Sequence, residues 1–166
     1  LAALAVVTPD DVSALKQRLR LSNAQAERIT LAATIAQSIT PQSDPIRLRA
    51  FIYRHGNAAV CDAIALCWAR HEAKRHASVS SIKTESPPAD SPPANAFSAM
   101  LAIAATWVAP ALPISAHDVL AHGLAPGPRI GGVMKAFERW WIEADFPRDK
   151  EQIKSKLAEL AVVTNR

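Results

Sequence analysis

Glycine, aromatic residues and cysteine are all scarce in this sequence of 166 residues. It has five glycines, two cysteines and only 5% aromatic residues. Strands favour β-branched and aromatic residues, so a chain in which alanine and leucine are common instead favours helices. With 49% hydrophobic residues, the sequence also lacks the low hydrophobicity of a disordered protein. We therefore predict an all-α protein with a packed core.

Long hydrophobic runs are missing as well. The longest covers residues 99–109 and ends at Pro110, well short of the roughly 20 residues that a membrane-spanning helix needs. The first seven residues lack the basic flank and length of a secretion signal, and the absence of an initial methionine indicates a piece of a longer polypeptide. Cys61 and Cys67 do not form a CxxC pair, so we expect reduced, buried thiols in a cytoplasmic protein that contacts no membrane.

Capping residues and prolines divide the chain into about eight helices. Predicted helix starts lie near residues 10, 22, 44, 57, 94, 115, 128 and 149. Residues 77–93 are rich in serine and proline, which interrupt both helices and cores. We predict two packed helical clusters: a body-like domain over residues 1–76 and a tail-like domain over residues 94–166, joined by this linker or insertion.

The segment between two of the predicted helices, residues 123–132, has the sequence GLAPGPRIGG. Pro126 and Gly127 suit the centre of a type II turn, and Pro128 suits the first turn of a helix. The free amide groups at such a helix start attract phosphate. The glycines would let the phosphate come close to the protein main chain, and Arg129 adds a positive charge. The alternative is a tight corner between helices, in which Gly127, Gly131 and Gly132 serve only packing.

The chain carries 19 Lys and Arg against 15 Asp and Glu, a net charge of +4 that is compatible with a polyanionic partner. Arg47 and Arg54 on one predicted helix, and Lys135 and Arg139 on another, are candidates for contacts with an RNA backbone. The alternative for each of them is an ordinary solvated helix face.

Combinations typical of catalytic and metal sites are missing from the sequence. Cys67 and His71 have the i, i+4 spacing of helical metal ligands, but both fall on an apolar stripe, which indicates packing. Trp140 and Trp141 are likewise assigned to the core by their helical spacing, rather than to a base-stacking platform. We predict no catalytic residue and no metal ligand in this chain.

Three segments resemble a known family. Residues 113–120, 123–131 and 140–147 read PISAHDVL, GLAPGPRIG and WWIEADFP, and they resemble the C-terminal tail of bacterial CCA-adding tRNA nucleotidyltransferases of the poly(A) polymerase family. Residues 18–23 (RLRLSN) and 48–56 (LRAFIYRHG) resemble the body segment that precedes the tail in that family. One departure is Ala116, where the family more often has glycine.

The resemblance implies a tRNA-binding piece of a nucleotidyltransferase. In that family the helical body and tail hold the tRNA by its shape and phosphates, while a head and neck carry the chemistry, with Mg²⁺ and with CTP and ATP as substrates. No counterpart of the head or neck is found in this sequence, so the implied cofactors belong to the missing head and this piece alone is expected to be inactive. The implied partners are tRNA or another RNA and the head and neck of the same polypeptide.

Two other functions fit the sequence. One is a helical scaffold or protein-interaction module that binds no RNA, for which the apolar corner and the proline-rich segment are the arguments. The other is a generic helix-hairpin-helix nucleic-acid binder, for which the glycine and proline corner at residues 123–128 is the argument.

Overall fold

The computed structural model describes residues 11–40, 42–81 and 94–164, and within these ranges it contains eight α-helices and no strand. The prediction of an all-α protein is thus confirmed. The chain divides into two compact units, Leu1–Ala109 and Pro110–Arg166. The boundary between the units lies at residues 109 and 110, whereas the sequence had placed it in the segment 77–93.

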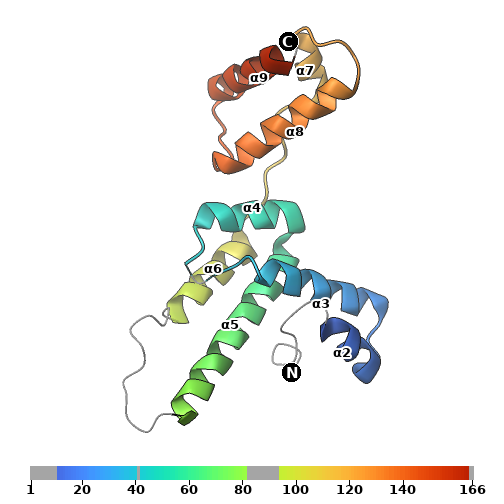
Figure 1. Ribbon diagram of the computed structural model, residues 1–166. Coiled ribbons are helices and arrows are strands. Elements are labelled where there is room, and N and C mark those ends of the chain that lie inside the picture. The colour runs from blue at the N-terminus through green and yellow to red at the C-terminus, as the bar shows by residue number, and fades with distance from the viewer. Residues whose placement is uncertain (1–10, 41, 82–93, 165–166) are drawn as a thin grey trace. The chain divides into compact units, whose positions relative to one another are not determined.

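The first unit is built around one long helix. It contains α2 (Asp11–Leu19), α3 (Asn23–Ala36), α4 (Pro45–His55), α5 (Asn57–Ser81) and α6 (Ala94–Thr106). Helix α5 packs against α3, α4 and α6, and Figure 1 shows α3 and α6 on opposite sides of it. The largest fully buried side chains of this unit come from α4, α5 and α6: Leu48, Ile52, Val60, Ile64 and Phe97.

Helix α6 belongs to the first unit, not to the C-terminal cluster in which the sequence had placed it. Phe97, Met100 and Ala104 of α6 are buried in the same core as Ile64 of α5. Asn57, the first residue of α5, helps to hold α6 there, because its side-chain amide donates hydrogen bonds to the carbonyl oxygens of Ala104 and Trp107, both at 2.8 Å. The Asn57 side chain therefore satisfies carbonyls at the C-terminal end of α6.

Helix α5 also continues further than expected. It runs to Ser81 and so includes the first five residues of the predicted linker 77–93. No proline or glycine interrupts residues 77–81, and the first proline follows only at position 87, so nothing in the sequence stops the helix earlier. The rest of the predicted linker, residues 82–93, lies outside the described residues.

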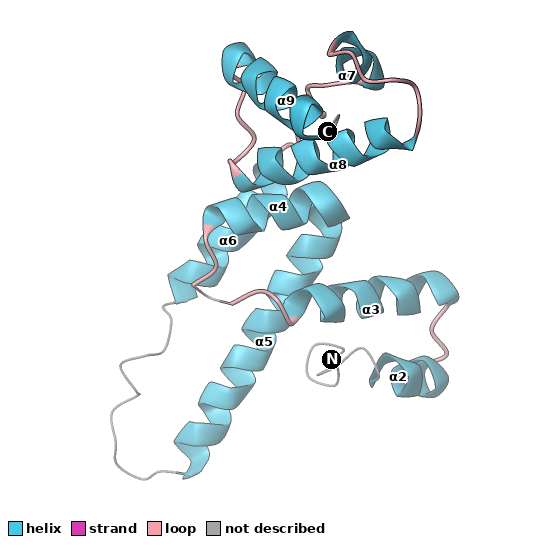
Figure 2. Cartoon of the chain, turned by 45° about the horizontal axis from the view of Figure 1, so that its top comes forward, coloured by secondary structure: helices cyan, strands magenta, loops and turns pink. Residues whose placement is uncertain are grey.

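The second unit is a small cluster of three helices, α7 (Ala116–Ala121), α8 (Pro128–Glu143) and α9 (Lys150–Thr164). Helix α8 packs against both α7 and α9, as Figure 2 shows. Its buried side chains Val133, Phe137 and Trp141 recur every four residues, so they form one continuous face. The predicted core role of the tryptophan pair is confirmed for Trp141, which is 2% exposed.

Candidate nucleic-acid interface

Helix α7 leads into the glycine and proline corner through a complete capping box. Ser115 Oγ accepts a hydrogen bond from the Asp118 amide at 3.4 Å, and the Ser115 amide donates to Asp118 Oδ2 at 2.7 Å. At the other end Gly123 has φ of 82°, the left-handed conformation that commonly ends a helix and that glycine adopts without strain. These two signals confirm the predicted bounds of the short helix before the corner.

The capping box makes the stability of α7 depend on pH. Hydrogen bonds from Ser115 hold the pKa of Asp118 below its ordinary value, first through the hydroxyl and then through the amide. A depressed folded-state pKa means that this stabilisation is present above the unfolded-state pKa and is lost as the pH falls below about 4. Asp118→Asn removes the titration, so we expect the difference in thermal midpoint between wild type and variant to shrink below about pH 4. An equal pH dependence of the two proteins would contradict this.

The corner itself is not the predicted type II turn. Gly127 has φ of 158° and ψ of −173°, whereas the third residue of such a turn needs about 80° and 0°. The cause is Pro128, because its ring clashes with the backbone of a preceding residue whose ψ is not extended. Gly127 is instead the extended N-cap of α8, and Pro128 occupies the first turn as predicted.

The start of α8 is open and has no acidic neighbour in its own first turn. Gly127 supplies no side-chain cap, and Gly127, Pro128 and Arg129 are all exposed. Among the described residues, the main-chain N–H of Arg129 has no hydrogen-bond partner. Such an uncapped helix start presents partial positive charge to the solvent and is suited to an anion.

A single exposed face runs from this helix start along α8. Residues three and four positions apart lie on the same face of a helix, and five exposed residues follow this spacing: Pro128, Gly131, Gly132, Lys135 and Arg139. We call these five residues the α8 stripe. It lies on the side of α8 away from the buried face that contains Val133 and Phe137. The structure thus brings four of the predicted site residues, Gly131, Lys135, Arg139 and the adjacent Gly127, to one side of one helix.

The glycines of the α8 stripe have no packing role within the described part of the chain. A Cβ atom built on Gly131 or Gly132 would meet no heavy atom within 4 Å, and the same is true of Gly127. The alternative interpretation of the corner, in which the glycines allow two helices to pack closely, is therefore not supported by these contacts. The cations of the stripe are also unengaged, since Lys135 and Arg139 form no ion pair with any residue that is described.

Arg47 and Arg54 lie in the first unit, on α4, and each unit is considered by itself. They are seven residues apart and exposed, so they share one face of that helix. Two residues that were not among the predicted site residues, Phe51 and His55, lie beside Arg47. Phe51 carries the Arg47 guanidinium over its ring at 5.9 Å, and its ring stacks on that of His55 at 6.3 Å. The i, i+4 spacing of Arg47, Phe51 and His55 in the sequence is the pattern from which this mixed aromatic and basic face could have been predicted.

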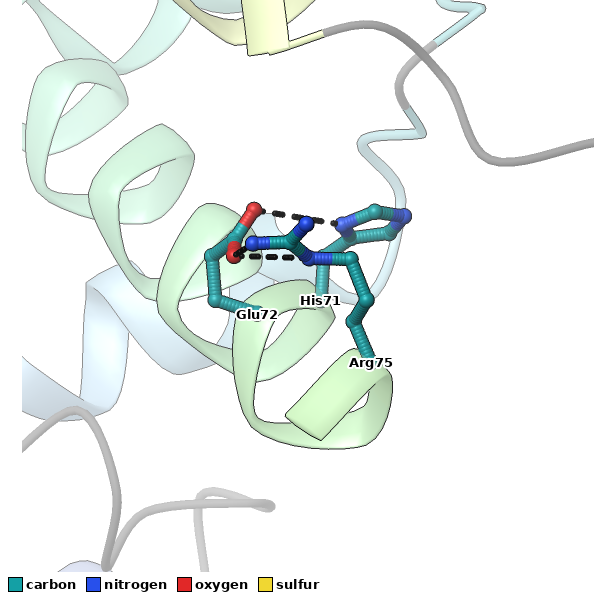
Figure 3. A network of polar contacts seen from close by, with 3 residues as sticks. All are labelled: His71, Glu72 and Arg75. Atoms are coloured by element: carbon teal, nitrogen blue, oxygen red, sulfur yellow. Dashed lines mark hydrogen bonds and ion pairs between the residues drawn. The ribbon is translucent and has the colours of Figure 1, made fainter. Parts of the chain in front are cut away.

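The basic end of α5 is engaged in contacts within the chain. Figure 3 shows Glu72 beside Arg75, which donates to Glu72 Oε2 from Nε at 3.0 Å and from Nη2 at 2.7 Å. His71 Nδ1 lies 3.9 Å from Glu72 Oε1, beyond hydrogen-bond distance. Arg70 and Lys74 also have partners. This part of α5 therefore offers less free positive charge than its sequence indicates.

The two thiols are free and half-buried. Burial raises the pKa of the Cys67 thiol, which donates to the Ala36 carbonyl oxygen at 3.2 Å, and burial followed by the nearby Asp62 carboxylate raises that of Cys61. Over residues 11–40, 42–81 and 94–164, no three His, Cys, Asp or Glu side chains gather as metal ligands would. Of the helices in these ranges, none combines the length and the apolar character needed to cross a membrane.

Comparisons with family models, with curated protein sequences and with solved structures gave no match for this chain, so its function has to be inferred from the α8 stripe and the residues around it.

Proposed function

We propose that this chain binds the phosphate backbone of a structured RNA through the α8 stripe and the uncapped start of α8. The resemblance of residues 113–147 to the tail of CCA-adding nucleotidyltransferases makes tRNA the proposed RNA. In this proposal the chain holds the tRNA while a head elsewhere in the polypeptide carries out nucleotide addition. Its contribution to catalysis is positioning, since a fixed arm keeps the reacting 3′ end in place.

The observation that carries the proposal is the glycine pair at positions 131 and 132. A glycine inside a helix destabilises it by about 1 kcal/mol relative to alanine. Neither glycine is compensated by close packing, because a Cβ at either position would face open space. A partner that approaches the backbone closely from outside is a physical reason for keeping both residues free of side chains.

The charges on and beside the stripe support a polyanion as that partner. Lys135 and Arg139 continue the face of the glycines over the next two turns of α8, and both are exposed. Arg129 lies next to the uncapped helix start, which itself favours phosphate. Contacts of this kind fix an RNA by its shape and backbone and carry little sequence information.

The test of the proposal is a titration with tRNA at several salt concentrations. Each neutralised phosphate lowers the logarithm of the binding constant by about 0.7 to 0.9 per decade of salt, so three contacts predict a slope of roughly −2 to −3. Duplex DNA of equal charge is the competitor, and its equal binding would favour the generic helix-hairpin-helix binder. Absence of tRNA binding at low salt, or binding that is indifferent to salt, would rule the proposal out.

The double variant Gly131→Ala/Gly132→Ala separates folding from binding. We expect it to raise the free energy of unfolding by up to about 1 kcal/mol per site, because alanine favours helix and no atom obstructs its Cβ. We also expect tRNA affinity to fall about tenfold, since the added methyl groups keep the RNA backbone at a distance. Thermal denaturation and filter binding measure the two effects.

The control is Ser155→Ala, on the exposed side of α9, which should leave tRNA binding unchanged. Unchanged tRNA binding of the glycine variant would contradict a close approach of the RNA backbone to α8.

A helical scaffold without RNA binding is the second candidate, and one observation favours it. Val162 and Val163 near the end of α9 are 58% and 68% exposed, and neighbouring exposed apolar side chains are a surface that a protein partner can cover. If the chain is a scaffold, Val162→Ser/Val163→Ser should abolish its self-association, and Gly131→Ala/Gly132→Ala should not affect that self-association. Light scattering over a range of protein concentrations distinguishes the two functions.

A further inference from the structure

A groove lies within the second unit, on the buried side of α8 and away from the α8 stripe. Its volume is about 640 Å³, within the range of about 300 to 1,000 Å³ typical of small-molecule sites. The floor consists of Ile114, Trp141 and Leu157, which are all buried. An apolar floor of this kind gains free energy when a ligand removes it from water.

Basic side chains line the same groove. Arg148, Lys150 and Lys154 contribute three positive charges and Asp118 one negative charge, which gives a net charge of +2 without counting His122. Lys154 is 3.5 Å from Glu151, but both side chains are largely exposed, so this pair is weak. The Asp118 carboxylate accepts hydrogen bonds from the hydroxyl and the amide of Ser115, both at 2.7 Å, and keeps its negative charge. With Asp118 counted, the net charge of the groove lining is therefore positive.

A constrained turn precedes the basic residues Arg148 and Lys150. Asp145 and Phe146 have φ of 62° and 58°, a left-handed conformation that is costly for residues other than glycine. The Phe146 ring is buried edge-on against Trp141 at 5.0 Å, and the Trp141 indole donates to the Pro147 carbonyl oxygen at 3.0 Å. These contacts hold the turn in place, and with it the backbone of Arg148, which precedes α9, and of Lys150, the first residue of α9.

A second part of the groove lining limits the kind of ligand. It consists of Pro110, Ala111 and Pro113, which precede α7. Proline has no main-chain N–H, so a peptide strand adding to this segment would lack donors at both proline positions. A ligand that needs only an apolar surface and a positive charge fits the groove better than an added strand.

We propose that this groove binds a small amphipathic organic anion. Its aromatic or alkyl part lies against Ile114, Trp141 and Leu157, and its carboxylate, sulfonate or phosphate lies beside Arg148, Lys150 and Lys154. The proposal does not depend on RNA binding, because the α8 stripe contributes no residue to the groove.

A matched pair of probes tests the proposal on the full chain. 8-Anilinonaphthalene-1-sulfonate has both an aromatic body and a sulfonate, and N-phenyl-1-naphthylamine lacks only the sulfonate. We expect the sulfonate to bind one to one with a Kd on the order of 10 to 100 µM, and the neutral probe to bind about tenfold more weakly. Equal affinity of the two probes would remove the role of the basic side chains, and lack of saturable binding of either would refute the site.

Three variants test whether the probes bind in the groove. Arg148→Gln/Lys150→Gln/Lys154→Gln should weaken binding of the sulfonate about tenfold and leave the neutral probe unaffected. Ala121→Phe, at an exposed position of the groove lining on α7, should block both probes without disturbing the core. Lys135→Gln/Arg139→Gln removes two charges outside the groove and should change neither. Sulfonate binding that falls as the protein concentration rises would show that a second copy covers the groove, and would overturn the proposal.

Discussion

Replacing Lys135 and Arg139 with glutamine is expected to lower the affinity of the chain for tRNA by about 10- to 100-fold near 0.1 M salt. Both side chains are exposed, and neither forms an ion pair with a described residue, so their full charge is available to phosphate. Loss of two phosphate contacts also predicts that the salt slope becomes less steep by roughly 1.4 to 1.8. Filter binding at four or more salt concentrations measures both quantities.

The control for this prediction is Arg148→Gln/Lys150→Gln, which removes the same charge from the same unit on the groove side of α8. If the RNA lies on the α8 stripe, the control changes affinity less than about threefold and leaves the slope nearly unchanged. Equal losses for the two variants would mean that tRNA responds to net charge alone, and the assignment of the stripe would then be wrong.

Phe137→Ala is expected to unfold most of the second unit. Phe137 is fully buried, and loss of such a ring costs about 3 to 5 kcal/mol. The unit comprises residues 110–166, and a cluster of this size has a total stability of only roughly 3 to 9 kcal/mol. Amide NMR spectra should therefore lose the dispersed signals of α7, α8 and α9, and tRNA binding should be lost with them.

Phe97→Ala provides the matched change in the first unit, where Phe97 is 1% exposed and stacks on Trp68 at 5.9 Å. Because the two units have separate cores, we expect this variant to destabilise α3 to α6 and to leave the signals of the second unit in place. A single common unfolding transition in both variants would contradict two independently packed units.

Helix starts were the most predictable features, because capping is local. The pairs Ser22 with Gln25 and Ser115 with Asp118 are each three residues apart, and both form complete capping boxes in the structure. A cap depends on the side chain and on amides within one turn, so the sequence contains all of its parts. Helix α5 likewise begins at Asn57, near the predicted position, but the contacts of the Asn57 side chain could not be predicted, since its partners Ala104 and Trp107 lie about 50 residues away.

For a similar reason, the sequence could not predict which of the two units α6 belongs to. Its apolar residues indicate a buried helix, but they do not specify which helices bury it. The proline-rich segment before it made residues 94–166 look like one domain. Contacts of α6 with α4 and α5 place it in the first unit, across a gap in the described residues.

The sequence by itself determined the helical class, the positions of the caps and the presence of glycines and cations along α8, because each depends on residue type and on spacing within a few turns. Tertiary structure alone decided that α6 packs in the first unit, that Gly127 is extended and not the end of a turn, and that Gly131 and Gly132 face open space. The physical reason is that burial depends on what packs against a residue from distant parts of the chain, and spacing along one helix contains no information about that.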